Sequence, residues 1–321
     1  MPGAIDRLAE VLAHGVVAAA VVQLLIRRLP IPSPALRLRY RLFALALPLV
    51  LAPALWALAP FRADDWFSDL AVFTSARWQR FSVAGIGLRD LGFGVLALLG
   101  LLLLLPDVVR LLTHWRRDRT AVREHVPAGD DAAVRLREQV TAIAGEMGVE
   151  PPRLLVFDTP AAVLHCRGVL TPTIVAARGI ADRLSAGQLR AAIAHELAHV
   201  RRRDVVHSWM LLALRLAQWF NPVAQILGRR AVQEMEWEAD RVAARVTGDP
   251  LAIARALVST ARARDTEFLG LLGRSRISAV EERCQRLLTL DPAAPESCRM
   301  SCAPELALTA LSLGGLLFFV R

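Results

Sequence analysis

The sequence has no lysine, one tyrosine and only four cysteines in 321 residues. All 39 of its Lys/Arg-type basic side chains are therefore arginines, a bias that we attribute to codon composition rather than to a nucleic-acid groove. No basic run alternates with the aromatic side chains on which bases stack, so direct nucleic-acid binding is not expected. The formal charge of +9 is interpreted first as a signal of membrane topology.

Long apolar runs are abundant instead. Apolar residues make up 55% of the chain and the mean hydropathy is positive, which is more apolar than a soluble domain of this length needs. A helix needs about 20 apolar residues to cross the hydrocarbon layer of a bilayer. Four stretches approach this length: residues 8–26, 42–59, 91–105 and 306–320. We predict four transmembrane helices in contact with membrane lipid.

The first and last of these stretches carry the weakest signals. Glu10 and His14 lie inside the first, either as functional intramembrane groups or at an N-terminal surface. A cleaved signal peptide is the alternative for this stretch, but Asp6 and Glu10 interrupt the basic region that such a peptide needs. The last stretch has 15 uncharged residues, so tilting or local thinning of the bilayer must make up the length.

Arginines indicate the orientation of the chain, because they collect on the cytoplasmic side of membranes. They cluster after the first and third stretches, at Arg27, Arg28, Arg37, Arg39, Arg41, Arg110, Arg116, Arg117, Arg119 and Arg123. Both clusters are expected in the cytoplasm, which places the N-terminus outside. Four crossings return the C-terminus to the outside, one residue past the last apolar position, and leave no room there for an extracellular sensor domain.

Three regions follow from this topology. They are an N-terminal membrane region with three spans (1–113), a cytoplasmic domain (114–303) and a fourth span (304–321). The expected location is the cell membrane, with a multi-pass chain. All four cysteines then face the reducing compartment, so no disulfide framework is expected.

The cytoplasmic region has mixed polar and apolar patterning. Residues 131–147 have the pattern of an amphipathic helix, and 153–157 and 168–177 that of short strands, with Pro172 pushing the second strand toward a sheet edge. The predicted fold class is therefore mainly α: a polytopic membrane protein whose cytoplasmic domain is α+β with a small sheet.

A capping box, Ser185 with Gln188, predicts the start of a helix that contains the sequence HELAH. On this helix His195 and His199 lie about 40° apart around the axis and about 6 Å along it, so both imidazoles can reach one ion. Glu196 is rotated by about 100° from His195, which places its carboxylate beside the metal as a general base. The alternative is a chance match with two hydrogen-bonded core histidines, and a third ligand is needed to decide.

The sequence EMEWEAD, residues 234–240, offers that ligand. Helical phase predicts that Glu234 and Glu238 lie on a solvated charged face, together with two arginines further along. Glu236 and Asp240 lie on the other face beside small residues. We predict Glu236 as the third ligand of Zn²⁺ and Asp240 as an acceptor that orients a ligand histidine, with an ion pair between Asp240 and a nearby arginine as the alternative.

The segment between the two motifs contains one long apolar helix, predicted over residues 205–224, and leaves enough chain for a return helix. We place the apolar helix in the protein interior or at the bilayer surface. If it crossed the membrane, the carboxylates and the histidines would lie on opposite sides. Asp204 is expected to pair with arginines rather than with metal. No spacing rule identifies the group that stabilises an oxyanion, for which His207 and several arginines are candidates.

With these motifs in view, the sequence resembles the BlaR/MecR-type membrane metallopeptidases, the antirepressor peptidases of beta-lactam signalling. The resemblance rests on HELAHVRRRD, QWFNP, EWEAD and a G-x-x-x-P-x-I pattern that begins at Gly168, and it covers most of the chain. It implies a gluzincin-like zinc peptidase domain that cleaves a cytoplasmic transcriptional repressor, with self-cleavage also open. HtpX-like and CAAX-prenyl-type proteases share the zinc motifs.

Two departures from the family pattern matter. The penicillin-binding domain that follows the fourth span in antibiotic-sensing members is not in this sequence, so acylation by a beta-lactam is not expected. Ala176 and Ala177 stand where the family strand often ends in proline. Three function classes remain: a regulatory zinc endopeptidase acting on a DNA-binding repressor, an HtpX-like quality-control metalloprotease, and a non-catalytic zinc-binding transducer. Oligomeric state is not indicated.

Overall fold

The computed structural model describes residues 3–29, 33–64, 66–67, 71, 81–83, 86–121, 131–158, 163–264, 276–292 and 302–320. Contacts between Cα atoms divide the chain into two compact units. The first unit contains Met1–Leu111, Met210–Glu234 and Ser297–Arg321, and the second contains Leu112–Trp209 and Met235–Glu296. Three of the described helices, α4, α8 and α9, contribute to both units, and in α9 the boundary runs between Glu234 and Met235.

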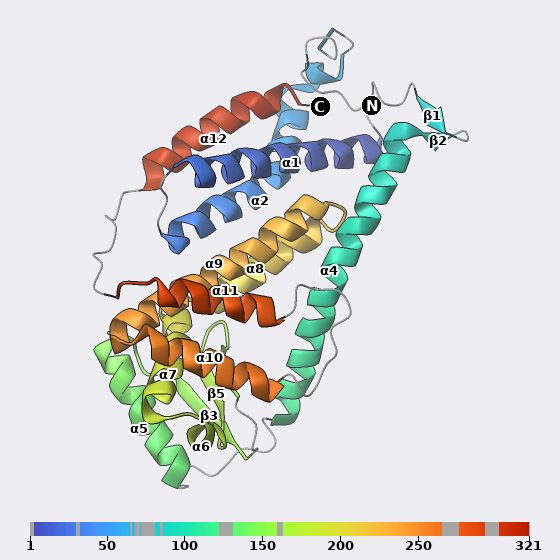
Figure 1. Cartoon of the computed structure of the whole chain (residues 1–321). Coiled ribbons are helices and arrows are strands. Elements are labelled where there is room, and N and C mark those ends of the chain that lie inside the picture. The colour runs from blue at the N-terminus through green and yellow to red at the C-terminus, as the bar shows by residue number, and fades with distance from the viewer. Residues whose placement is uncertain are drawn as a thin grey trace. The chain divides into compact units, whose positions relative to one another are not determined.

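Apolar helices dominate the first unit: α1 (Ala4–Arg28), α2 (Pro34–Leu58), α4 (Leu88–Ala121) and α12 (Cys302–Phe318). α1 packs along α2, and α12 lies beside both (Figure 1). A short 3₁₀ turn, η1 (Pro60–Ala63), and a two-residue hairpin of β1 (Ser82–Val83) and β2 (Ile86–Gly87) lie between α2 and α4 in the sequence.

Three of the four predicted spans coincide with helices that are long and apolar enough to cross a membrane: α1, α2 and the Leu88–Thr113 part of α4. The predicted fourth span falls on α12, whose apolar part over Thr309–Phe318 is too short to be counted among these three. A fourth crossing therefore stays a prediction.

Two further helices, α8 (Asp204–Ala217) and α9 (Pro222–Thr247), form a hairpin, as Figure 1 shows. The prediction of one helix over residues 205–224 was wrong, because the sequence around Asn221 reverses the chain. The Asn221 side-chain oxygen accepts hydrogen bonds from the backbone N–H groups of Val223 and Ala224, at 3.0 and 3.3 Å, and Pro222 follows at the first helical position. This is the favoured chemistry of a helix start, and the sequence signal for it was present.

Polar side chains of the hairpin are buried rather than solvated. Gln218 donates to the backbone oxygen of Leu45 in α2 at 2.8 Å, and Gln225 donates to two backbone oxygens of α8 and its end. Arg215 and Arg229 both bind Asp107 of α4. Because buried polar groups are costly unless paired, these bonds fix the N-terminal part of α9 within the first unit.

A glycine allows α4 to approach the turn of this hairpin. A Cβ atom at Gly100 would lie 2.5 Å from the backbone oxygen of Trp219 and 2.9 Å from the backbone carbon of Phe220. Both atoms belong to the main chain, so they cannot move aside as the end of a side chain can. Close backbone contact at Gly100 is therefore part of the packing of α4.

The second unit contains the sheet and the helices around it. The strands are β3 (Arg153–Phe157), β4 (Leu164–Arg167) and β5 (Thr173–Ala177), in the order β3-β5-β4, with β3 parallel and β4 antiparallel to β5. The helices are α5 (Asp131–Glu146), α6 (Ile180–Arg183), α7 (Ala186–Arg202), α10 (Pro250–Arg264) and α11 (Arg276–Leu288). Side chains from α5, α7, the strands and the end of α9 share one apolar core.

The predicted strand over residues 168–177 begins later and lies elsewhere in the sheet than expected. β5 starts at Thr173 and is the central strand, so the prediction of an edge position was wrong. Pro172 precedes the strand, where its missing N–H costs no ladder bond, and its carbonyl accepts from the N–H of Arg153 at 3.2 Å. Gly168 has φ +89° in the turn before it.

Substitution at Gly100 tests the close approach of α4. Gly100→Ala is expected to lower the free energy of unfolding by about 1–3 kcal/mol, because the new methyl group overlaps main-chain atoms. Gly94→Ala, on the same helix with nothing within 4 Å of its Cβ position, is the matched control and should be neutral or stabilising. Unfolding of the detergent-purified protein, followed by tryptophan fluorescence, measures both. Equal stability of the two variants would contradict this packing.

Candidate metal centre

Helix α7 presents the two histidines of the HELAH motif. Its start is set by the predicted capping box, in which Ser185 and Gln188 exchange side-chain and backbone hydrogen bonds. The helix passes through the apolar core, where Ala191, Ala194 and Ala198 are fully buried. His195 and His199 extend from the same side, with 3.1 Å between their Nε2 atoms.

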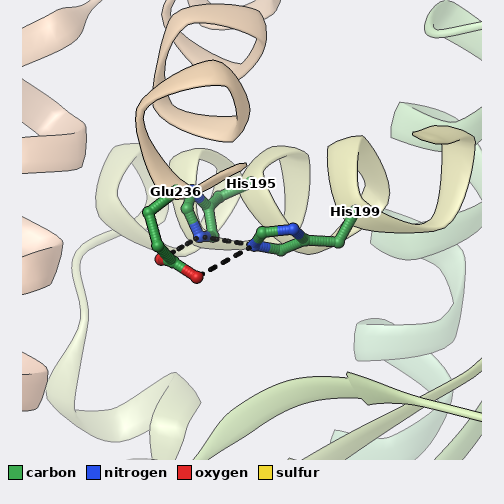
Figure 2. A group of neighbouring side chains, drawn as sticks. All are labelled: His195, His199 and Glu236. Carbon is green, nitrogen blue, oxygen red and sulfur yellow. Dashed lines mark hydrogen bonds and ion pairs between the residues drawn. The ribbon is translucent and has the colours of Figure 1, made fainter. Parts of the chain in front are cut away.

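Glu236 reaches these histidines from α9. One of its carboxylate oxygens lies 3.6 Å from His195 Nε2 and the other 3.8 Å from His199 Nε2. Figure 2 shows the three side chains converging, the histidines from one helix and the glutamate from another. Their ligand atoms all lie within 4.8 Å of one another. The structure thus brings together the three residues that the sequence proposed as metal ligands.

The spacing fits a shared ion. Two ligands at about 2.0–2.2 Å from a tetrahedral Zn²⁺ lie about 3.4 Å apart. The three separations of 3.1, 3.6 and 3.8 Å bracket that value. Imidazole nitrogens with one carboxylate oxygen are also a donor set that suits zinc. The residues present therefore fit a metal ion.

Two aspartates hold the outer nitrogens of the histidines. Asp240 Oδ1 lies 3.0 Å from His195 Nδ1, and Asp204 Oδ2 lies 2.8 Å from His199 Nδ1. A carboxylate beside Nδ1 favours the proton on that nitrogen, so that Nε2 is the nitrogen that would lose its proton and bind a metal. The expected arginine partner of Asp204 is also present, since Arg202 lies 3.5 Å away. What the sequence did not reveal is that Asp204 contacts His199 as well.

The charges of this group perturb its pKa values. Burial alone would lower the pKa of His195, but the Asp240 and Glu236 carboxylates outweigh it and raise that pKa to about 10. Burial would raise the pKa of Glu236, but the Arg283 guanidinium and both histidines hold it well below its usual range. The carboxylates of Glu236 and Asp240 are therefore ionised at neutral pH, as ligand and acceptor roles require.

Glu196 lies on α7 outside the group of ligand atoms, as its helical phase predicted. Its Oε2 accepts a hydrogen bond of 2.8 Å from the backbone N–H of Cys166 in β4. This bond fixes the carboxylate between α7 and the edge of the sheet. A carboxylate beside, rather than within, a His-His-Glu group is positioned for proton transfer.

Arg283, on α11, is a member of the site that sequence reasoning missed. Its guanidinium donates to both oxygens of Asp240, at 2.6 and 2.7 Å, and to Glu236 at 2.8 Å. One of its nitrogens lies 3.5 Å from His195 Nε2. The sequence separation from Glu236 is 47 residues, and no motif spacing points to it. His207, which the sequence offered as an oxyanion donor, lies 3.7 Å from Asp204 instead.

The predicted charged face of α9 is not solvated. Glu234 and Glu238 are buried, with relative exposures of 1% and 5%, so that prediction was wrong. Helical phase separated the four carboxylates correctly into two faces, but it does not reveal which faces have partners. Glu238 binds Arg241 on its own helix, and Glu234 binds two arginines of α2.

Helices of membrane-spanning length together with a His-His-Glu group define the class of membrane metallopeptidases. Comparison of the sequence with protein families agrees, since the model of the family described as BlaR1 peptidase M56 matches residues 94–275, more than half of the chain. The protein belongs to this peptidase family.

Among individual relatives, the proteins named as HtpX protease homologues predominate. The homologue from Acidiphilium cryptum is 30% identical, over 46% of this chain and 63% of its own length, and that from Ralstonia pickettii is 29% identical, over 46% and 64%. The regulatory protein BlaR1 of Bacillus licheniformis is 34% identical over 23% of this chain and 12% of its own length. The chain thus matches just under two thirds of the HtpX homologues and a small part of BlaR1.

The aspartates behind the histidines are expected to control metal affinity. Asp240→Asn and Asp204→Asn should each weaken zinc binding by about 10–100-fold, because each removes the charge that orients one ligand imidazole. Competition with a chromophoric chelator measures the dissociation constant. Asp182→Asn, at an exposed position of α6, is the control and should bind as the parent does. Unchanged affinity in both site variants would contradict the assignment of these partners.

Arg283 is expected to act as the counter-charge of the metal-free site. Arg283→Ala should lower the free energy of unfolding of metal-free protein by about 3 kcal/mol, because it removes the guanidinium that offsets the buried charges of the Glu236 and Asp240 carboxylates. A bound metal ion supplies positive charge, so the deficit should shrink at saturating zinc. Urea unfolding with and without zinc tests this, with the exposed Gln285→Ala on the same helix as the control. An equal deficit in both conditions would refute it.

Proposed function

We propose that the protein is an integral-membrane zinc-dependent endopeptidase that cleaves a cytoplasmic transcriptional repressor during signal transduction. The observation that carries the enzymatic part is the convergence of His195, His199 and Glu236 with the Glu196 carboxylate beside them. Membership of the M56 peptidase family supports the same reaction class. The similarity to BlaR1, a protein named as regulatory, supports the choice of substrate.

In this proposal His195, His199 and Glu236 would hold Zn²⁺, which would supply Lewis acidity and lower the pKa of water toward about 7. Glu196 accepts the proton of the attacking water and passes it to the leaving amine. The hydrogen bond from the Cys166 N–H keeps the Glu196 carboxylate directed at this task. Asp240 and Asp204 hold the two histidines in the required tautomer.

The edge of the sheet offers a place for the substrate chain. Among the described strands β4 pairs only with β5, and we infer that an extended peptide substrate adds beside its other edge. Because Cys166 of β4 contacts Glu196, a peptide that adds to this edge passes the general base. Main-chain recognition of this kind suits a protein substrate.

The proposed topology is a multi-pass protein of the cell membrane with the N-terminus outside and the catalytic domain, residues 114–303, in the cytoplasm. It is supported by the three helices of spanning length and by the arginine clusters that follow α1 and lie toward the end of α4. A fourth span over residues 304–321 completes it. This arrangement places the peptidase in the same compartment as a DNA-binding repressor.

A second candidate is a quality-control protease that degrades damaged membrane proteins. The specific observation in its favour is that relatives matched over 182 and 183 residues are named as HtpX protease homologues. Such an enzyme cuts unfolded chains broadly, whereas a regulatory peptidase cuts one partner at one site. A non-catalytic zinc transducer is disfavoured, because metal binding alone does not require a carboxylate held where Glu196 lies.

Glu196→Gln separates catalysis from metal binding. The variant should bind one equivalent of zinc, because the three ligands are intact, and should lose cleavage by a factor of about 10² or more, because no base accepts the proton. Metal analysis and a peptide-cleavage assay measure the two properties, and Glu238→Gln serves as a control with normal activity. Undiminished cleavage by the Glu196 variant would remove the enzymatic proposal.

The substrate class is tested with purified protein and two substrates, a candidate repressor and a denatured casein, each with and without a metal chelator. Chelator-sensitive cutting at one site in the repressor alone supports the regulatory proposal. Cutting of casein at many sites supports the quality-control alternative instead.

A further inference from the structure

Helix α9 carries two glutamates, Glu234 and Glu236, that bind different parts of the molecule. Residues two apart on a helix differ by about 200° around the axis and about 3 Å along it. The two carboxylates therefore leave the helix on nearly opposite sides. Glu236 reaches the histidines of the candidate metal centre, and Glu234 reaches α2.

The contacts of Glu234 are close and buried. One carboxylate oxygen accepts from Arg37 Nε at 2.8 Å, and the other accepts from Arg41 Nη2 at 3.2 Å. Glu234 and Arg41 are almost fully buried, with side-chain exposures of 1% and 5%. We call Glu234, Arg37 and Arg41 the Glu234 clamp. A buried charge is costly unless it is paired, so α9 cannot leave the arginines of α2 at this point without a large penalty.

The clamp is connected beyond α2. Arg41 also donates to the side-chain oxygen of Gln23 in α1, at 3.3 Å, so both apolar helices share in holding Glu234. On the next residue of α9, the backbone oxygen of Met235 accepts from Arg202 at the end of α7, at 3.3 Å. Three consecutive residues of α9 thus bind α2, the end of α7 and the ligand histidines.

This arrangement makes the ligand position sensitive to the clamp. Side chains of a helix end about 5–6 Å from its axis, so a rotation of α9 by about 20° moves the Glu236 carboxylate by about 2 Å. Distances between metal and ligand tolerate only about 0.2 Å. The ion pair of Glu234 on the opposite side of α9 is the contact nearest to Glu236 that binds this helix to α2, so it restrains the rotation of α9 at the ligand position.

We propose that Glu234 is a positioning residue for the metal centre, through which α2 sets the affinity and geometry of the site. The inference rests on the proposed metal site and goes beyond it, because it assigns control of that site to an apolar helix near the N-terminus. Movement of α2 relative to α9 weakens the hold of Glu236 on the ion. The Glu234 clamp is in this way a route from the membrane helices to the catalytic group.

The test uses full-length protein that carries Glu196→Gln, so that no self-cleavage occurs, loaded with Co²⁺ in place of zinc. The visible absorption of Co²⁺ reports the geometry of its ligands, and chelator competition gives its dissociation constant. Glu234→Gln should raise that constant at least tenfold and change the absorption spectrum. Glu234→Asp, which keeps the charge on a shorter side chain, should recover part of the loss.

The matched control is Glu238→Gln. Glu238 lies one turn further along α9 and is equally buried, but its partner Arg241 is on the same helix. If the clamp only stabilised the fold, the two glutamine variants would behave alike at the metal. If Glu234→Gln does not fold, as judged by size exclusion and circular dichroism, Arg37→Gln replaces it, because Arg41 and Glu234 then remain as a neutral pair.

The outcomes are distinct. A weakened, spectrally altered site in the Glu234 or Arg37 variant, with a parental site in the Glu238 variant, supports the proposal. Parental affinity and spectrum in both clamp variants overturns it and leaves the peptidase proposal intact. Failure of the parent protein itself to bind Co²⁺ or zinc overturns both.

Discussion

The site depends on the close packing of two helices. α9 must lie close enough to α7 for the Glu236 side chain to reach the imidazoles of His195 and His199. The helix surfaces that make this approach possible are lined with alanine. Ala191, Ala194 and Ala198 of α7 and Ala239, Ala243 and Ala244 of α9 are all fully buried in one core. Small side chains let helix axes lie close together, and they supply apolar burial without blocking the polar group between them. Larger side chains at these positions would hold Glu236 away from the histidines.

Close packing of α9 against α7 requires the chain to turn back after the histidines. α8 leads away from α7 and α9 returns, and the turn between them is made by Asn221 and Pro222. Charged and amide groups of the hairpin are paired with the apolar helices of the first unit, so the N-terminal part of α9 is fixed there while its C-terminal part carries Glu236 and Asp240. The helix α9 is thereby one of the described helices that contribute to both units, together with α4 and α8.

Much of the site could be predicted from the sequence, because it follows from the spacing of residues that are close together in the chain. The i, i+4 histidines, the carboxylate after the first histidine and the phase of Glu236 and Asp240 follow from helix geometry alone. The first strand and the capped start of α7 were equally local, and the structure has both where they were expected. The same rules predicted a solvated face at Glu234, where the structure has a buried ion pair.

What sequence could not give are contacts between residues distant in the chain. Helical phase tells which residues share a face, but not what covers that face, so the burial of Glu234 by Arg37 and Arg41 was not foreseen. Arg283 lies on α11, whose sequence contains no motif that points to the site. Its contact with Glu236 depends on the packing of α11 against α10. The end of α8 was mispredicted for a different reason. The Asn221-Pro222 sequence indicates the start of a new helix, but the apolar run around it favoured one continuous helix.

The central claim is that two imidazoles and one carboxylate surround a single zinc ion. X-ray absorption at the zinc edge of the purified, zinc-loaded protein measures this directly. The expected result is a first shell of nitrogen and oxygen at about 2.0–2.1 Å with the multiple-scattering signature of two imidazoles, which is lost on His195→Ala or His199→Ala. A shell with sulfur at about 2.3 Å, or imidazole scattering unchanged by those substitutions, would contradict it.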